Sequence, residues 1–400
     1  MPISSPSRPS MGIQAEPSSS PKSVRMLDFV EASTVTGPAK NLIEFARCAR
    51  NSASPLRVDM AIATFCRGRS YASNQFTLAC QNAGLEVHSI RERFPYDLAI
   101  LPAMRKLIHA YDPDIVETHS VKSHFLMRMT GMHRKHRWIA FHHGYTWTST
   151  RTRIYNRLDR LSLPSAMKVV TVCRPFGCAL EEIGVNRERI VIQNNSVRPF
   201  VPAADDQVAQ LRRRLGIAMG TTVLLAVGRL SAEKGQFDLI RAMKLLRKRK
   251  LRLLIVGEGP DRRRLRDIAR TLRLADSVTF VGHQADVTPY YTLADLMVLP
   301  SHTEGSPNCL LEAMAAGLPV VATAVGGVPE IVSTENAAIL VEKGNPSALA
   351  QAISQVLDDE LLRAQLLTAA RKTAKAYSPE SYCDALLSLY GDCLAEAPRP

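Results

Sequence analysis

Short apolar runs alternate with longer helical patterns along most of the chain, and this alternation constrains the fold more than any other feature. Runs of about four to eight residues rich in β-branched side chains are typical of buried strands, and the patterns between them are typical of helices. Strands joined by crossover helices form parallel sheets. The sequence therefore predicts an α/β fold with two doubly wound, Rossmann-like parallel sheets, one in each half.

The expected strands divide into two groups along the chain. In the first half we expect strands at Arg25–Val30, Arg57–Ala63, Leu85–Ile90, Ile115–Thr118, Trp138–His142, Lys168–Val172 and Ile190–Ile192. In the second half we expect strands at Val223–Val227, Leu253–Val256, Val278–Val281, Leu296–Leu299, Val320–Ala322 and Ala338–Val341.

The chain length of 400 residues exceeds one ordinary core and suits two domains of roughly 150 to 200 residues each. Residues 1–23 are rich in Ser and Pro without the apolar core of a secretory signal, so we expect a disordered tail. The first domain is predicted over 24–197 and the second over 211–377. A linker is predicted over 198–210, because Arg198–Asp206 holds two prolines and no periodicity. A C-terminal helix is expected over 378–396.

The net charge of +14 favours polyanionic partners, and the excess is concentrated in one segment. Between Lys122 and Lys168 only Asp159 is acidic, and the basic residues are Lys122, Arg128, Arg134, Lys135, Arg137, Arg151, Arg153, Arg157, Arg160 and Lys168. Two interpretations stay open, a solvated basic face and a surface that docks on an anionic inner leaflet. Basic and aromatic residues are not interleaved in the pattern of a nucleic-acid site, so we expect no nucleic-acid partner.

The cysteines and the hydropathy pattern indicate where in the cell the protein is expected. The eight cysteines form no CxxC pair and have no histidine at zinc-ligand spacing, so we expect mostly buried, reduced thiols and no metal site. No run of about 18 apolar residues is long enough to cross a bilayer. We expect a cytoplasmic protein, peripheral on the inner face of the membrane if the basic segment docks there.

In open parallel sheets, ligands bind beyond the carboxyl ends of the strands, so the loops that follow strands should carry the chemistry. After the strand ending at Val227, the loop Gly228–Gly235 holds Arg229 and Lys234. The planar fork of Arg and the compact charge of Lys can together stabilise negative charge on a leaving diphosphate.

The segment after Leu299, PSHTEGSPNCLLE, holds two carboxylates across a strand-to-helix junction, Glu304 and Glu312. We expect Ser306 to be the N-cap and Pro307 the first helical residue, so that the positive end of the helix faces an anion. Carboxylates suit vicinal diols of a ribose or a hexose. The donor-binding positions predicted around this junction are Gly305, Ser306, Asn308, Leu310 and Glu312.

The segment that follows, EAMAAGLPVVATAVGGVPEIV, together with TGPAKNLIEFAR, PDIVETHS, AFHHG, VGRLSAEKG and ADLMVLPS, resembles retaining glycosyltransferase family 4, whose architecture is called GT-B. The resemblance implies two Rossmann-like domains facing each other across a cleft, the first binding the acceptor and the second binding a nucleotide sugar. It also implies that the C-terminal helix crosses back to the first domain.

The resemblance implies a role for individual residues as well. Glu312 is expected to bind the donor ribose, Glu304 the transferred sugar, and Arg229 and Lys234 the diphosphate. Gly37 is expected to let the backbone approach the phosphates, although Pro38 follows it where the family often has a second glycine. His143 is expected beside the transferred sugar. Strand alternation favours His143 over His142, but the residues leave both open.

The expected reaction is transfer of a hexose-type sugar from a UDP- or GDP-sugar to a lipid-linked glycan or a surface polysaccharide precursor. No second acid is placed as a nucleophile, so front-face displacement with retention is expected, without a metal or other cofactor. Two alternatives stay open, a nucleotide-sugar epimerase of the same architecture and a catalytically silent nucleotide-sugar-binding protein.

Two further motifs are interpreted as structural. The Asp-x-Asp sequence at Asp112–Asp114 encloses a proline before a strand and is interpreted as a turn. The Gly257–Pro260 sequence lacks the third glycine of a dinucleotide fingerprint and the acidic residue that follows it at the usual interval.

Overall fold

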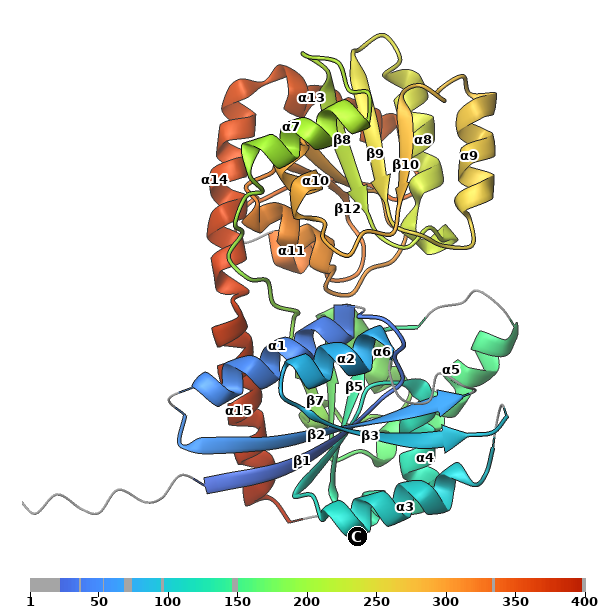
Figure 1. The fold of residues 1–400 in the computed structure, drawn as a ribbon, viewed down its shortest axis with the longest axis vertical. Helices are drawn as coiled ribbons and strands as arrows, with labels where there is room; N and C mark the ends of the chain where they lie inside the picture. Colours follow the sequence, from blue (N-terminus) through green and yellow to red (C-terminus); the bar gives the residue numbers. More distant parts are fainter. Residues whose placement is uncertain are drawn as a thin grey trace, which may run out of the picture.

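The computed structural model describes residues 22–35, 37–52, 54–67, 74–94, 97–145, 150–332 and 335–397, without the side chains of 22 and 150–154. These residues form two lobes, each built on a parallel β-sheet covered by helices (Figure 1). The α/β fold predicted from the sequence, with two doubly wound sheets, is confirmed. All but the last residues of the predicted tail lie outside the described residues.

The N-terminal sheet has seven parallel strands in the order β3-β2-β1-β4-β5-β6-β7. Its strands are β1 Lys22–Val30, β2 Leu56–Arg67, β3 Glu86–Glu92, β4 Ile115–Thr118, β5 Arg137–His142, β6 Lys168–Thr171 and β7 Ile190–Ile192. Its helices are α1 Gly37–Asn51, α2 Gln75–Asn82, α3 Ile100–Tyr111, α4 Val121–Thr130, α5 Thr150–Ser162 and α6 Arg174–Glu182.

The C-terminal sheet has six parallel strands in the order β10-β9-β8-β11-β12-β13. Its strands are β8 Thr222–Val227, β9 Leu251–Val256, β10 Val278–Gly282, β11 Leu296–Leu299, β12 Val320–Thr323 and β13 Ile339–Val341. The helices of this half are α7 Asp205–Arg214, α8 Gln236–Leu245, α9 Arg262–Thr271, α10 Thr288–Leu293, α11 Asn308–Ala315, α12 Val328–Val332, α13 Pro346–Asp358 and α14 Glu360–Ala376.

Each predicted strand is present, and the differences lie at element ends. Helix α7 begins at Asp205, inside the range predicted as linker, because Asp205 and Asp206 in its first turn favour a helix start. The extended connection after β7 therefore ends earlier than the sequence indicates. Strand β1 begins at Lys22, also earlier than predicted.

The last helix, α15 (Pro379–Ala395), packs on the N-terminal lobe, while α14 lies along the C-terminal lobe (Figure 1). Tyr390 of α15 lies edge-on against Phe45 of α1, with ring centroids 5.6 Å apart. The Arg137 guanidinium of β5 donates hydrogen bonds to the carbonyl oxygens of Cys393 and Glu396. The chain therefore crosses between the lobes twice, after β7 and again at the end of α14.

Fewer cations of the basic segment between Lys122 and Lys168 are unpaired than the charge count indicates. Lys122 pairs with the buried carboxylate of Glu92 at 2.9 Å, and Lys168 pairs with Glu396 at 3.1 Å. The side chains of Arg151 and Arg153 lie outside the described residues. Among the described helices, none is both long and apolar enough to cross a membrane.

Candidate active site

The Arg229 loop, Gly228–Gly235, follows β8 and packs tightly against its neighbours. Gly235 has φ of +63°, and a Cβ there would come within 1.9 Å of the Pro300 carbonyl oxygen. On the other side, a Cβ on Gly257 would come within 1.9 Å of the Gly228 carbonyl oxygen. Only glycine allows backbones to approach this closely. The Gly257–Pro260 sequence thus supports the Arg229 loop.

Lys234 and Glu304 form the central ion pair of the site. The Lys234 ammonium donates to both Glu304 oxygens, at 2.7 and 2.8 Å, and the Ser301 hydroxyl donates to one of them at 2.6 Å. Burial alone would lower the pKa of Lys234, but the Glu304 carboxylate outweighs it and the pKa lies above its ordinary value. Lys234 is therefore a fixed positive charge held on a buried carboxylate.

Arg229 differs from Lys234 in having no such partner. Its side chain is exposed, and it forms no ion pair with any residue that the structure describes. Its carbonyl oxygen accepts a hydrogen bond from the Gln236 amide at 2.9 Å, which fixes the backbone of the loop. The guanidinium is free to bind an anionic ligand beside Lys234.

The start of α11 differs from the prediction by one residue. Helix α11 begins at Asn308, with Pro307 extended at the N-cap position, so Ser306 is not the N-cap. The Ser306 hydroxyl instead accepts the backbone N–H of Asn195 at 3.0 Å. The Asn195 amide donates to the Ser306 carbonyl oxygen and to the Asn308 side chain. Asn195, from the end of the N-terminal domain, therefore holds this junction across the interdomain boundary.

Two glycines of the predicted donor site also lie at contacts between the domains. A Cβ on Gly37 would lie 3.3 Å from the Asn308 side-chain nitrogen. A Cβ on Gly305 would lie 2.5 Å from Val172 and 2.9 Å from Phe176, both in the N-terminal domain. Gly37, Gly305, Ser306 and Asn308 are thus brought together where the domains meet. Leu310 is not, because its side chain is fully buried in the C-terminal core.

Glu312 lies at the edge of an interdomain cavity of about 560 Å³. Its carboxylate accepts a hydrogen bond from the Tyr291 hydroxyl at 3.0 Å and pairs with Lys40 of α1 at 2.5 Å. The Tyr291 side chain is buried while Lys40 is about half exposed. Glu312 is therefore oriented by its own domain and contacted by the opposite domain, which is the geometry expected of a group that holds a ligand in a cleft.

The two histidines at the end of β5 point to opposite faces of the sheet. His142 is buried, with its Nδ1 atom 3.4 Å from Asp159, and Asp159 also pairs with His124 at 2.6 Å. His143 lines a small cavity on the α1 and α15 side of the sheet. Burial lowers the pKa of His143 well below its ordinary value, so the imidazole is neutral at pH 7. Of the two, His143 is the histidine that faces a cavity.

Sequence reasoning missed the groups that hold the predicted residues in place. Lys40, Asn195 and Tyr291 each contact a predicted site residue, but they lie far from those residues in the chain. Asp238 pairs with His302 at 2.7 Å beside the Pro300–Glu304 loop. Lys40 lies within the quoted segment TGPAKNLIEFAR, and Asn195 follows a predicted strand, but neither position indicates which residue it contacts.

Comparison with known families addresses the class of protein. The family model described as "Glycosyl transferases group 1" matches residues 207–373, and "Glycosyl transferase 4-like domain" matches residues 45–195. Together the two models span most of both domains. Each domain thus matches a glycosyltransferase model of its own, and neither model alone spans half of the chain. The chain is a glycosyltransferase of GT-B architecture, consistent with family 4.

Individual relatives give the extent of the similarity. The chain is 36% identical to a D-inositol 3-phosphate glycosyltransferase of Salinispora arenicola over 52% of this chain and 50% of that protein. It is 26% identical to an N-acetyl-alpha-D-glucosaminyl L-malate synthase of Bacillus anthracis over 77% of this chain and 82% of that protein. The first match thus spans only half of the relative.

Among solved structures, HepE of Anabaena in complex with UDP-glucose superposes with a TM-score of 0.79. The match covers 92% of this chain and 100% of that chain at 19% identity. At this identity the similarity shows the fold, and the two-domain GT-B arrangement is therefore confirmed.

Proposed function

We propose that this glycosyltransferase moves a hexose-type sugar, with retention of configuration, from a UDP- or GDP-sugar to a lipid-linked glycan or a surface polysaccharide precursor. The observation that carries the proposal is the Lys234–Glu304 ion pair at the carboxyl ends of β8 and β11, together with the exposed Arg229, which lies in the same loop as Lys234 and forms no ion pair with a described residue. Glu312, on the helix α11 that follows the Glu304 loop, lines the interdomain cavity.

The proposed chemistry assigns a role to each group. Arg229 and Lys234 bind the diphosphate and stabilise the charge that develops as it leaves. Glu304 accepts hydrogen bonds from hydroxyls of the transferred sugar, and Glu312 does the same for the ribose. His143, as a neutral imidazole, exchanges hydrogen bonds with a sugar hydroxyl. In front-face displacement the departing phosphate oxygen accepts the acceptor's proton while the new glycosidic bond forms on the same face.

Donor binding is proposed to need no metal ion. Divalent cations commonly neutralise a diphosphate when the protein offers few positive charges there. Here the loop supplies two cations, Arg229 and Lys234, and the Glu304 carboxylate that contacts the loop is already paired with Lys234. Donor affinity is accordingly expected to survive a chelator.

The membrane-linked acceptor is supported by a surface patch on α4 and α5. Met129 and Leu161 are large apolar side chains that are 51% and 60% exposed, and Arg128 and Arg157 are exposed beside them on the same two helices. Apolar side chains combined with basic ones favour the surface of an anionic membrane. We infer docking through this patch, with the inner face of the membrane as the location.

Vesicle flotation tests the docking. The wild-type chain is expected to bind vesicles containing anionic lipid more strongly than neutral vesicles, and Met129→Ser with Leu161→Ser should weaken that binding. Met219→Ser is the matched control, because Met219 is 81% exposed on the other domain. Equal binding to neutral and anionic vesicles would contradict the docking.

A second kind of acceptor is favoured by the relatives. Both curated relatives described above are named for small anionic acceptors, inositol 3-phosphate and malate. An acceptor of that kind would be a soluble, anionic alcohol and would not need the membrane patch.

A sugar-transfer assay tests the proposed function. The purified chain is incubated with UDP- or GDP-hexoses and with one of two kinds of acceptor, either lipid-linked glycans extracted from membranes or small anionic alcohols. The anomeric configuration of the product is then determined by NMR. Retention in a transferred sugar supports the proposal. Inversion would contradict the mechanism, conversion of the donor without acceptor would indicate an epimerase, and donor binding without turnover would indicate a silent binding protein.

A further inference from the structure

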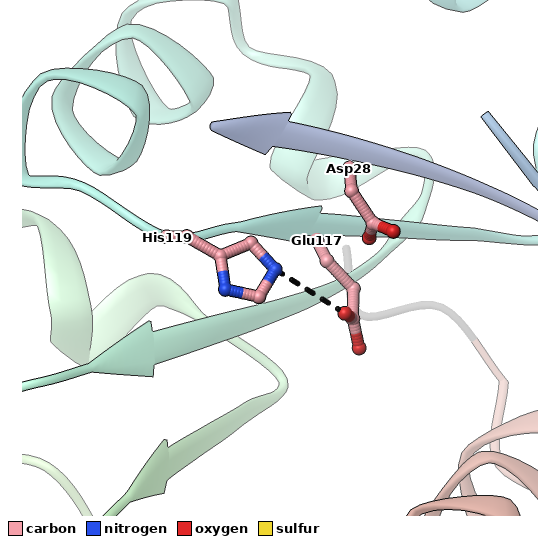
Figure 2. A group of neighbouring side chains, drawn as sticks. All are labelled: Asp28, Glu117 and His119. Atoms are coloured by element: carbon pink, nitrogen blue, oxygen red, sulfur yellow. Dashed lines mark ion pairs between the residues drawn. The ribbon is translucent and has the colours of Figure 1, made fainter. Parts of the chain in front are cut away.

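A buried cluster of Asp28, Glu117 and His119 lies in the N-terminal sheet (Figure 2). Glu117 and His119 line the same small cavity as His143. Asp28 on β1 is the register partner of Glu117 on β4, so the two carboxyl groups extend side by side from the same face of the sheet. His119 follows Glu117 by two positions and therefore lies on the same face. Asp28 and Glu117 are 0% and 1% exposed and the His119 side chain is 6% exposed, so little of the cluster reaches solvent.

The polar atoms of the cluster have few partners outside it in the described part of the chain. Both oxygens of Asp28, one oxygen of Glu117 and the Nε2 atom of His119 make no well-formed hydrogen bond, and the two carboxyl groups interact with each other and with the Tyr390 hydroxyl. The only ion pair that either carboxyl group forms with a described residue is that of Glu117 with His119. Burying carboxylates without compensation is costly, so these groups must share protons or bind a cation.

The distances fit a shared cation. One ligand atom from each residue lies within 4.8 Å of the other two. The Glu117 Oε2 and His119 Nε2 atoms are 3.5 Å apart, which is long for a charge-assisted hydrogen bond. Two ligands bound about 2.05 Å from a tetrahedral zinc ion are about 3.4 Å apart. The separation therefore matches two ligands of one ion better than a donor and an acceptor.

A small cavity offers room for the rest of the coordination. Its volume is about 10 Å³, the space of roughly one water molecule, and its lining includes Glu117, His119, His143 and Tyr390. The Tyr390 hydroxyl is also buried, beside the Glu117 carboxyl group. A water molecule bound to the ion could fill this space, and groups that contact metal ligands commonly orient them.

We infer that Asp28, Glu117 and His119 bind one divalent transition-metal cation, of which Zn²⁺ fits one imidazole and two carboxylates. The cation ties β1 to β4 beneath the loop that carries His143. This site lies in the N-terminal domain, and the metal independence proposed for donor binding concerns Arg229 and Lys234 of the other domain. No local motif indicates this site, because the elements from α1 to α3 separate Asp28 from Glu117 in the chain.

Metal analysis of the full chain tests this inference. Protein produced without a metal-affinity tag is dialysed against metal-free buffer, and its metal content is measured by mass spectrometry. About one zinc per chain is expected, and stripping with a strong chelator should lower the melting temperature, which added Zn²⁺ should restore. Asp28→Asn and His119→Gln are expected to weaken Zn²⁺ affinity by at least about 100-fold. His302→Gln is the matched control, because its partner Asp238 lies in the other domain.

A spectroscopic probe keeps the test valid if a variant folds poorly. Stripped wild-type chain titrated with Co²⁺ should develop visible absorption bands of nitrogen and oxygen coordination that saturate at about one ion per chain. A stripped wild-type chain that neither binds Co²⁺ nor is stabilised by Zn²⁺ would overturn the inference and leave the carboxyl groups sharing protons. Zinc retained equally by Asp28→Asn and His119→Gln would overturn it too, because the ion would lie elsewhere.

Discussion

Substitutions in the Lys234–Glu304 pair can distinguish the contribution of Lys234 to stability from its contribution to catalysis. Breaking a buried ion pair typically costs about 3–5 kcal/mol, because the remaining charge is left uncompensated. Lys234 keeps 27% of its side chain exposed, and Glu304 retains its bond from Ser301, so we expect about 2–3 kcal/mol for Lys234→Ala. For a domain of this size that corresponds to a fall in melting temperature of roughly 4–12 °C.

The same substitution also removes a charge on the leaving diphosphate, which typically lowers kcat by about 10² to 10³. The double variant Lys234→Ala with Glu304→Gln removes the stranded carboxylate, so it should recover most of the melting temperature but none of the turnover. The assays are thermal unfolding and steady-state sugar transfer. Near-normal turnover in Lys234→Ala, or a double variant no more stable than the single one, would refute this reasoning.

Three further predictions follow from the described geometry. Arg229→Ala should lower kcat by about 10² to 10³ at an unchanged melting temperature, because its side chain is exposed without an ion pair; a large loss of stability would refute this. Gly235→Ala should destabilise the C-terminal domain by at least about 1–2 kcal/mol in a denaturant titration, since its φ is positive and its Cβ would meet Pro300; unchanged stability would argue against that contact. The pKa of His143 is lowered by burial, so the stability it contributes is present above the unfolded pKa of about 6.5 and lost as pH falls below it. His143→Gln should therefore reduce the fall in melting temperature between about pH 7 and pH 5. An unchanged pH dependence would contradict the lowered pKa of His143.

The strands could be predicted from the sequence because each is marked by a run of apolar residues within the strand itself. Runs such as Val223–Val227 and Leu296–Leu299 are buried on both faces of their sheet, so they read as continuous apolar segments. Helix starts were less certain, because Ser306 and Pro307 each suit more than one position near an N-terminus. The structure places Ser306 against Asn195, a contact between domains that propensity cannot indicate.

The candidate site was only partly predictable for the same reason. Loops after strands carry recognisable charges, so Arg229, Lys234 and Glu304 could be named from the sequence. Their partners could not, because Lys40 reaches Glu312 across the domain boundary, from a helix on the other sheet. For the basic segment, the sequence overestimated the number of free cations, because a charge count cannot show that Lys122 forms an ion pair with Glu92.

The central claim is that the C-terminal domain binds a nucleotide diphosphate without a metal ion, through Glu312 and the two cations. Calorimetric titration of the purified chain with UDP and GDP, in buffer containing a chelator, tests it most directly. Glu312→Ala should weaken binding of the preferred nucleotide by about 10- to 150-fold, the loss expected for hydrogen bonds to a charged group. Glu360→Ala is the matched control, because that carboxylate lies at the start of α14, is 90% exposed and should not contribute to binding. Selective binding of one nucleotide that Glu312→Ala weakens is the predicted result, whereas no binding of either nucleotide, or binding that appears only when a divalent cation is added, would contradict it.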